Sequence, residues 1–293
     1  SKIDIILDKN EKILIYLNKR WSYNLLVCQD CQYIYKCPRC DISLTVHLQQ
    51  WLLVCHHFYY NEKINLKCIK CDSTNLKNIW VWTEQIENFL KQKYKDKKFY
   101  RLDTDNIKTK KDKENALKQI DNSQIIIWTK MITTGFNFKN LGLIWVILLE
   151  QELQIPEYDT EERVYSNIKQ LIWRWWRVWQ KTDIIIQTYT PENNIIKDIV
   201  YSNYKDFFKK TLQERKLFWY PPFKDYVVLV YKDKEKVKSI SYMQNLELDI
   251  QKLAKNTDIE IILVKNPTKR NNQYFTKIIL KWENLREFLQ NLK

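Results

Sequence analysis

The segments Cys28-Gln-Asp-Cys31, Cys37-Pro-Arg-Cys40 and Cys68-Ile-Lys-Cys71, with the single Cys55 between the second and third, contain all seven cysteines of the chain. In each pair two residues separate the thiols, so one tight turn presents both sulfurs to the same tetrahedral ion. Three such pairs are a strong signal for zinc. We predict a zinc-binding module over residues 28–77, with structural ions whose four protein ligands leave no position open for water.

Eight ligands would form two sites, and the spacing favours a nested arrangement. We predict an outer site of Cys28, Cys31, Cys68 and Cys71, and an inner site of Cys37, Cys40, Cys55 and His57. The interval from Cys40 to Cys55 is close to that of zinc ribbons. The eighth ligand is the open question, because Phe58 stands where a cysteine is expected. His56 or His57 would have to replace it, and an inner site that is weak or empty is the alternative.

The composition describes a globular, basic protein. The chain has 293 residues, 45% of them hydrophobic, and a formal net charge of +14, which favours a polyanionic partner. The alternative is an AT-biased genome, which enriches lysine and would produce this charge without a functional meaning. There is no apolar run of the roughly 20 residues that a bilayer requires, and the N-terminus lacks a signal-peptide pattern. Reduced, metal-binding cysteines then indicate a cytoplasmic protein without a membrane association.

Outside residues 28–77, apolar runs alternate with helical patterns. The expected strands are 13–17, 99–102, 125–128, 143–149 and 183–189, and the expected helices are 83–94, 111–120 and 161–172. Buried strands that alternate with helices predict a parallel α/β sheet covered on both faces, with ligands at the carboxyl ends of the strands. After residue 200 the pattern changes to a helix over 203–216, strands at 226–231, 259–264 and 275–281, and helices near 234–254 and 283–292. This pattern predicts a second, smaller α/β domain.

Two later segments carry further chemical signals. Residues 128–138, WTKMITTGFNF, place one of the two glycines of the chain, Gly135, just after a predicted strand. Residues 170–177, QLIWRWWR, end a predicted helix with Arg174 and Arg177 on one face. Paired arginines suit a planar grip on phosphate, although a solvated helix face is the more common explanation for such a pair alone.

Taken together, these segments resemble the PriA family, the primosomal replication-restart DNA helicases of superfamily 2. The last helicase motif of that family, Gln-x-x-Gly-Arg-x-Gly-Arg, is matched in register by Gln170, Arg174 and Arg177, and the motif before it by Thr129, Met131, Gly135 and Phe138. The cysteine block resembles the zinc insert of the family, and Tyr220-Pro-Pro-Phe223 follows in the family's order. The resemblance covers nearly the whole chain and is weakest after Lys232.

The resemblance implies a domain plan and a set of site residues. Residues 1–27 and 78–200 would form a RecA-like second helicase lobe, residues 28–77 the zinc insert, and residues 201–293 the family's C-terminal domain. Arg177 would be the arginine finger on a nucleotide held by the first lobe, Gln170 and Arg174 would orient it, and Gly135 would let the backbone approach the same site. Arg20 and Thr129 would contact the DNA backbone.

The resemblance also implies that the chain is incomplete as a motor. It contains no Gly-x-x-x-x-Gly-Lys-Ser/Thr loop, so we expect a fragment that lacks the first lobe and does not hydrolyse ATP alone. Residues 134–137, TGFN, replace the family's Lys-Gly-His-Asp and lose a charge on each side of the motif. This difference calls the coupling of that loop to ATP into question.

The sequence leads to one main functional hypothesis and one alternative. The main hypothesis is the C-terminal portion of an ATP-dependent 3′–5′ DNA helicase for primosome assembly and fork restart. It would bind zinc, forked or single-stranded DNA, primosome proteins and single-strand-binding proteins, and it would need ATP and Mg²⁺ on the missing lobe. The alternative is a non-catalytic zinc-ribbon protein that binds nucleic acid. A weaker third interpretation is association with a membrane surface through the Trp and Arg cluster at 173–179.

Tryptophan stands where the family has glycine. The chain has two glycines and twelve tryptophans, and the tryptophans at 21, 82, 128, 145, 173, 176 and 219 occupy glycine positions of the family. Glycine serves where the backbone needs a positive φ or a close approach, and Trp is the bulkiest obstruction at such a site. We therefore hypothesise that the organism reads the UGA codon as glycine. The alternative is a genuinely Trp-rich aromatic and cationic surface.

Overall fold

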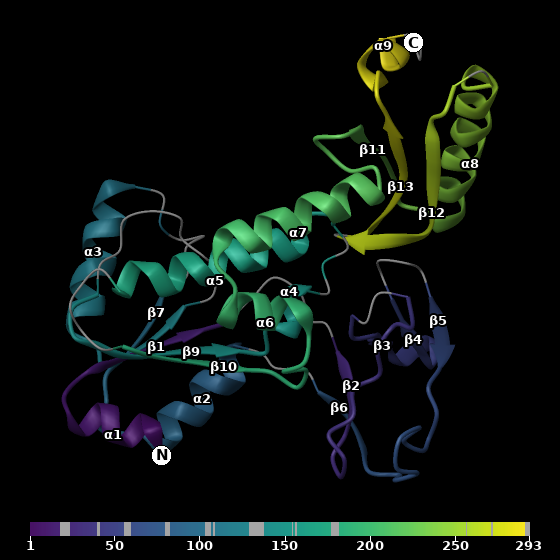
Figure 1. The fold of residues 1–293 in the computed structure, drawn as a ribbon. Helices are drawn as coiled ribbons and strands as arrows, with labels where there is room; N and C mark the ends of the chain where they lie inside the picture. Colours follow the sequence, from purple (N-terminus) through teal and green to yellow (C-terminus); the bar gives the residue numbers. More distant parts are fainter. Residues whose placement is uncertain are drawn as a thin grey trace. The chain divides into compact units, whose positions relative to one another are not determined.

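A computed structural model describes most of the chain. The described residues are 1–17, 24–39, 42–55, 60–79, 83–102, 107, 109–128, 138–153, 155, 157–176, 182–255, 257–270 and 272–290. They form two compact units, Ser1–Ser202 and Asn203–Lys293 (Figure 1).

The first unit is built on a five-stranded parallel sheet. The strands are β1 (Lys12–Tyr16), β7 (Phe99–Leu102), β8 (Ile125–Trp128), β9 (Leu141–Ile147) and β10 (Asp183–Gln187), in the order β10-β9-β1-β8-β7. All four neighbouring pairs are parallel. The residues of β1, β8 and β9 are almost all apolar, because a parallel sheet is covered on both faces. The predicted α/β class with a parallel sheet is confirmed.

Helices cover both faces of this sheet. They are α1 (Lys2–Asp8), α2 (Thr83–Lys93), α3 (Lys110–Asp121), α4 (Glu150–Leu153), α5 (Thr160–Trp176) and α6 (Asn194–Tyr201). Figure 1 shows α1 and α2 on one face of the sheet, with α5 and α6 on the other. The start of α3 is fixed by a capping box, in which the Thr109 hydroxyl accepts from the Asp112 N–H and the Asp112 carboxylate accepts from the Thr109 N–H.

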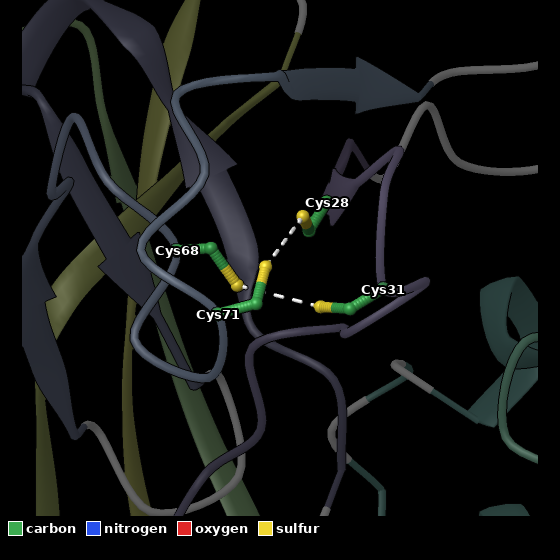
Figure 2. A group of neighbouring side chains, drawn as sticks. All are labelled: Cys28, Cys31, Cys68 and Cys71. Atoms are coloured by element: carbon green, nitrogen blue, oxygen red, sulfur yellow. Dashed lines mark hydrogen bonds between the residues drawn. The ribbon is translucent and has the colours of Figure 1, made fainter.

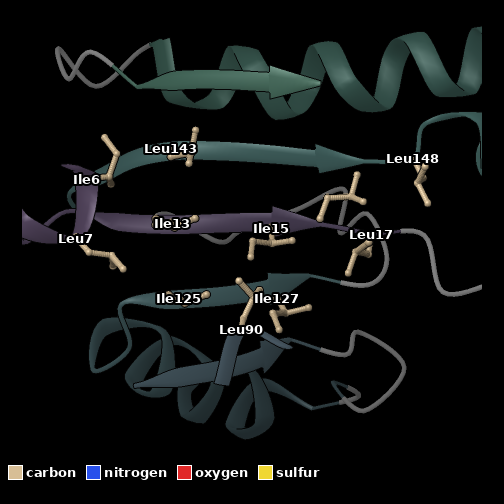
Figure 3. Close-up of a cluster of buried hydrophobic side chains, with 11 residues drawn as sticks. Ile6, Leu7, Ile13, Ile15, Leu17, Leu90, Ile125, Ile127, Leu143 and Leu148 are labelled. Atoms are coloured by element: carbon tan, nitrogen blue, oxygen red, sulfur yellow. The ribbon is translucent and has the colours of Figure 1, made fainter. Parts of the chain in front are cut away.

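One core cluster of this unit lies between the sheet and the helices on the α1 and α2 face. It joins residues from β1, β8 and β9 with residues from both helices, as Figure 3 shows. Its buried members are Ile6, Leu7, Ile13, Ile15, Leu17, Leu90, Ile125, Ile127, Leu143, Ile147 and Leu148. Gly142 lies where α1 approaches β9. A Cβ there would come within 2.9 Å of the Ile6 side chain and would meet the Glu11 side chain, so both neighbours would have to shift to admit any other residue.

Two local differences from the sequence prediction have physical causes. The strand expected over 143–149 ends at Ile147, because Leu148 adopts a left-handed conformation with φ of 53°. Helix α6 was not predicted. Its signal is Asn193, whose side chain accepts from the Ile195 N–H at the N-cap position, followed by apolar residues at helical spacing.

The cysteine segments lie on a second sheet, inserted between β1 and α2. Its strands are β2 (Leu25–Cys28), β3 (Thr45–His47), β4 (Leu52–Val54), β5 (Asn61–Lys63) and β6 (Leu76–Ile79), with a 3-10 turn over Leu48–Gln50. The sheet is antiparallel in the order β5-β4-β3-β2-β6. The first and last strands of this sheet, β2 and β6, pair with each other, with Leu25 opposite Ile79. The two ends of the inserted segment therefore lie side by side. We call residues 25–79 the cysteine module.

The second unit combines a three-stranded antiparallel sheet with helices. Its elements are α7 (Tyr204–Leu217), β11 (Asp225–Asp233), α8 (Lys236–Leu253), β12 (Glu260–Arg270), β13 (Gln273–Trp282) and α9 (Leu285–Gln290), with the sheet order β11-β13-β12. Met243 and Ile250 of α8 and Phe288 of α9 join Ile278 and Leu280 of β13 in one core.

A buried lysine of β13 binds the loop that precedes β11, residues 218–224, to this sheet. The Lys281 ammonium donates to the Phe218 carbonyl at 3.2 Å, pairs with Glu260 at 3.1 Å and lies 4.2 Å from the centre of the Tyr220 ring. A buried ammonium needs such partners because it has left water.

None of the helices in the described ranges has both the length and the hydropathy that crossing a bilayer requires.

Candidate metal centre and the carboxyl edge of the parallel sheet

Four cysteines meet at one end of the cysteine module. Cys28 and Cys31 face Cys68 and Cys71, as Figure 2 shows. The Sγ atoms of Cys28 and Cys71 are 3.6 Å apart, as are those of Cys31 and Cys68, and all four sulfurs lie within 4.8 Å of one another. Zn–S bonds of about 2.3 Å in a tetrahedron place sulfurs about 3.8 Å apart. The four thiols therefore fit a zinc ion with no open coordination position.

Each of the four cysteine segments forms the same kind of backbone turn. In each, the N–H of the first cysteine donates to the carbonyl five residues later; the pairs are Cys28 to Tyr33, Cys37 to Ile42, Cys55 to Tyr60 and Cys68 to Ser73. Two of these turns also direct an N–H at the first sulfur, from Arg39 to Cys37 at 3.5 Å and from Lys70 to Cys68 at 3.4 Å. Such donors favour the thiolate that a metal requires.

The residue after the second cysteine of the two outer turns is left-handed. Gln32 follows Cys31 with φ of 58°, and Asp72 follows Cys71 with φ of 56°. This conformation turns the chain back after the second sulfur, and glycine would adopt it with less strain. The Gln32 side chain donates to the Gln29 carbonyl at 2.7 Å and holds the first turn closed.

Hydrogen bonds also set the proton affinity of the first ligand. Backbone donation from Cys31 lowers the pKa of Cys28 to about 7, against the opposing effect of its burial. Burial raises the pKa of Cys31. Backbone donation from Ser73 lowers the pKa of Cys71, but its hydrogen bond with Cys31 and its burial outweigh this and raise that pKa to about 12, so without metal the cluster ionises first at Cys28.

The inner cysteines lie in the apolar core of the module. Cys37 and Cys55 are buried with Leu26, Leu44 and Leu53 among others. Cys40 and His57 fall outside the described residues, as do His56 and Phe58. The shared turn at Cys55 makes position 58 the equivalent of the second cysteine in the other turns, and Phe58 supplies no ligand there.

The predicted nucleotide and DNA residues lie mostly outside the described ranges. Arg20, Thr129, Gly135 and Arg177 are among them. Gln170 is exposed on α5, and Arg174 belongs to the same helix one turn later.

Two buried carboxylates lie at the carboxyl edge of the parallel sheet, on the short helix α4. Glu150 Oε1 accepts from both the hydroxyl and the N–H of Thr190, from the Tyr189 N–H at 2.7 Å, and from the Thr188 hydroxyl. Its side chain thereby fixes the segment that leaves β10. The sequence carries little signal for this role, because an acidic residue after a strand is ordinarily solvated.

The second carboxylate, Glu152, is hydrogen-bonded to Tyr16 at the end of β1. Burial raises the pKa of Glu152 to about 7, although the Tyr16 hydroxyl and the charge of Arg163 oppose this shift. The folded protein therefore binds more protons here than the unfolded chain between about pH 4.5 and pH 7. Stability falls as the pH rises through that window, because ionised Glu152 is buried.

Replacing Glu152 by Gln is expected to remove this pH dependence. A shift from 4.5 to about 7 corresponds to roughly 3 kcal/mol, so the variant should be more stable than the parent by about 1–3 kcal/mol above pH 7. Near pH 5 the two proteins should differ little. Urea unfolding at pH 5, 6, 7 and 8 measures the effect. The exposed Glu114 of α3 offers the control Glu114→Gln, which should run parallel to the parent.

Comparison with known proteins finds similar sequences. Residues 37–57 match the PriA DNA helicase Cys-rich region (CRR) domain. The chain is 32% identical to replication restart protein PriA of Haemophilus influenzae over 219 residues, which are 74% of this chain and 30% of that protein. The PriA of Borreliella burgdorferi is 30% identical over 78% of this chain, and that of Bacillus subtilis 29% over 81%.

The chain spans about a third of the length of these relatives, 30% of the Haemophilus influenzae and Bacillus subtilis proteins and 34% of the Borreliella burgdorferi protein. The four-cysteine cluster and the match to the cysteine-rich region together support zinc as the bound metal.

Proposed function

We propose, from the premise that this chain is a relative of replication restart protein PriA, that it forms the zinc-bearing second lobe and C-terminal domain of a replication restart DNA helicase. The observation that carries this proposal is the cysteine module, inserted between β1 and α2 of a parallel sheet and holding four sulfurs at zinc spacing. A free-standing zinc ribbon would not need to interrupt a sheet of this kind.

The nucleotide would lie at the carboxyl edge of the parallel sheet. In our proposal Arg177 reaches the transferring phosphoryl group of an ATP held with Mg²⁺ on a first lobe, and Gln170 and Arg174 orient it. Gly135 allows the backbone to approach the same place. The exposed Gln170 on α5 and the helical spacing of Arg174 support this assignment. ATP hydrolysis then depends on residues outside this chain.

The DNA would be bound through its backbone. The net charge of +14 supplies the attraction, and Arg20 and Thr129, each a short step beyond the carboxyl end of β1 or β8, are our proposed contacts. Forked or single-stranded DNA is the proposed substrate, with primosome and single-strand-binding proteins as partners. Contacts to phosphate are independent of sequence and weaken with salt.

We propose two zinc sites, of which the inner one binds its ion with the lower affinity. The outer ion binds Cys28, Cys31, Cys68 and Cys71. The inner ion binds Cys37, Cys40 and Cys55 and takes His57 as its fourth ligand. The shared turns at Cys37 and Cys55 support an inner site of the same design, and Phe58 explains why it would be the weaker one.

DNA binding is tested by Arg20→Ala in the zinc-loaded protein. We expect the affinity for a forked oligonucleotide to fall about 3- to 10-fold, and the slope of log affinity against log salt to fall by about 0.7–0.9, since one phosphate contact is lost. Fluorescence anisotropy at four salt concentrations measures both quantities.

The matched control is Lys111→Ala, which removes one positive charge from the exposed surface of α3. An equal loss in both variants would show that only overall charge attracts DNA, and would remove Arg20 from the proposal.

DNA-stimulated ATP hydrolysis by the complete gene product, lost in Arg177→Ala, separates the helicase from the non-catalytic binding protein. Its absence from the parent protein would contradict the helicase proposal.

A further inference from the structure

One carboxylate connects the two halves of the outer metal site. Asp30 lies between Cys28 and Cys31, and its side chain crosses to the segment that follows Cys71. Asp30 Oδ2 accepts from the Ser73 hydroxyl at 2.5 Å, and Asp30 Oδ1 accepts from the Asn75 amide at 2.9 Å. The Ser73 oxygen accepts in turn from the Asn75 N–H at 3.0 Å. Both carboxylate oxygens are thus used to join the turns that carry the four sulfurs.

Among the described residues, backbone pairing and one tyrosine also connect these turns: the Tyr35 hydroxyl donates to the Lys67 carbonyl at 3.1 Å. The Gln29 N–H donates to the Asn75 carbonyl at 2.9 Å, and Cys28 lies opposite Leu76 in the pairing of β2 with β6. These bonds fix the bases of the two turns. Cys31 and Cys71, the second cysteines of their turns, lie outside this backbone pairing. The hydrogen bonds of Asp30 are made by the residue directly before Cys31.

The charge of Asp30 would by itself disfavour zinc retention. Four thiolates around Zn²⁺ carry two net negative charges, and a third negative group one residue from Cys31 repels them. Its hydrogen bonds have the opposite effect, because they hold the sulfur pairs at the spacing a tetrahedral ion needs. Charge and hydrogen bonding therefore predict opposite results when Asp30 is replaced.

We propose that Asp30 is a positioning residue of the outer zinc site, which slows zinc release by clamping the Cys28 turn to the Cys68 turn through Ser73 and Asn75. The side chain does not contact the metal; it acts on its neighbours. Groups that orient metal ligands from outside the coordination shell typically change affinity about 10- to 100-fold. The inference depends on the zinc site and on neither DNA nor ATP.

The test is the rate of zinc release from the zinc-loaded protein into excess chelator, followed with a colorimetric zinc indicator. The phase of release that Cys28→Ser abolishes belongs to the outer site. We expect Asp30→Ala to accelerate that phase about 10- to 100-fold, and Ser73→Ala to accelerate it by a smaller factor. Asp30→Ala combined with Ser73→Ala should match Asp30→Ala alone, because both variants break one connection.

Asp72→Asn is the matched control. Asp72 directly follows Cys71, and within the described residues its carboxylate makes no hydrogen bond, so the variant removes the same charge beside a ligand without breaking the clamp. It should release zinc no faster than the parent. Cobalt loaded in place of zinc should keep its tetrahedral thiolate absorption in Asp30→Ala, since all four ligands remain.

Three results would overturn the proposal. Unchanged or slower release in Asp30→Ala would show that charge outweighs the clamp. Equal acceleration in Asp72→Asn would show that a substitution beside a ligand speeds release without breaking the clamp. A lost tetrahedral cobalt spectrum would make Asp30 a general folding residue. If Asp30→Ala does not fold, Ser73→Ala decides alone: parental release rates in that variant contradict the clamp.

Discussion

Removal of zinc by a chelator under reducing conditions is expected to unfold the cysteine module while the parallel sheet stays folded. The strands of the module are three or four residues long, and its main core has seven buried residues, of which two are cysteines. A core of this size stabilises little by itself, whereas structural zinc contributes on the order of 10 kcal/mol to folding. The parallel sheet has its own, larger core.

Hydrogen exchange with mass spectrometry measures this effect segment by segment. Peptides covering β2–β6 should lose protection on chelation, and those covering β1, β8 and β9 should keep it. The variant Cys28→Ser with Cys68→Ser should have lost protection in β2 and β6 before chelator is added, and chelator should then act on it only through the inner ion. Restored zinc should restore protection of β2 and β6 in the parent alone. Retained protection of the module after verified zinc loss would show that the metal does not hold this fold.

Glycine is expected at positions 173 and 176 when the protein is isolated from its natural host and its peptides over 170–180 are sequenced by mass spectrometry. The structure adds a physical argument to the composition. Trp51 and Trp219 adopt left-handed conformations with φ of 52° and 56°, and both side chains are exposed. A left-handed residue with a Cβ is strained by about 1 kcal/mol or more, and glycine is not. Tryptophan found at 173 and 176 would refute the recoding.

Comparing glycine with alanine tests the local strain independently of the natural host. At Trp51, the Gly variant should be more stable than the Ala variant by about 1 kcal/mol, because both lose the indole and only Ala keeps the strain. At Trp145, in the middle of β9 and without a positive φ, the order should reverse by about 0.5–1 kcal/mol. Urea unfolding of the zinc-loaded variants measures both differences. The same order at both positions would argue against a strained Trp51.

The parallel sheet was predictable because its signal is local and repeated. Runs such as residues 125–128 are apolar at every position, which only a strand covered on both faces requires. The strand order was not predictable from these runs, since any of them could occupy the centre. The end of β9 depended on the conformation of Leu148, a residue with no intrinsic preference for a left-handed φ.

The four-cysteine cluster was predictable from spacing because both cysteines of a pair lie in one turn. The roles of Glu150 and Asp30 were not. Each depends on partners about 40 residues away, Thr188 to Thr190 for Glu150 and Ser73 with Asn75 for Asp30. An acidic side chain is ordinarily a solvated group, and only the folded chain shows which ones accept hydrogen bonds from distant segments.

The pairing of β2 with β6 has a consequence for how quickly the parallel sheet can form. Strand β1 pairs directly with β8, Ile13 opposite Ile125, although more than 100 residues separate them in the chain. Once Leu25 lies beside Ile79, about half of that interval is bypassed. Halving the length of a loop lowers the entropic free-energy cost of closing it by about 0.6 kcal/mol, which raises the probability that β1 and β8 meet two- to threefold. A metal-loaded insertion therefore delays the folding of its host less than its residue count suggests.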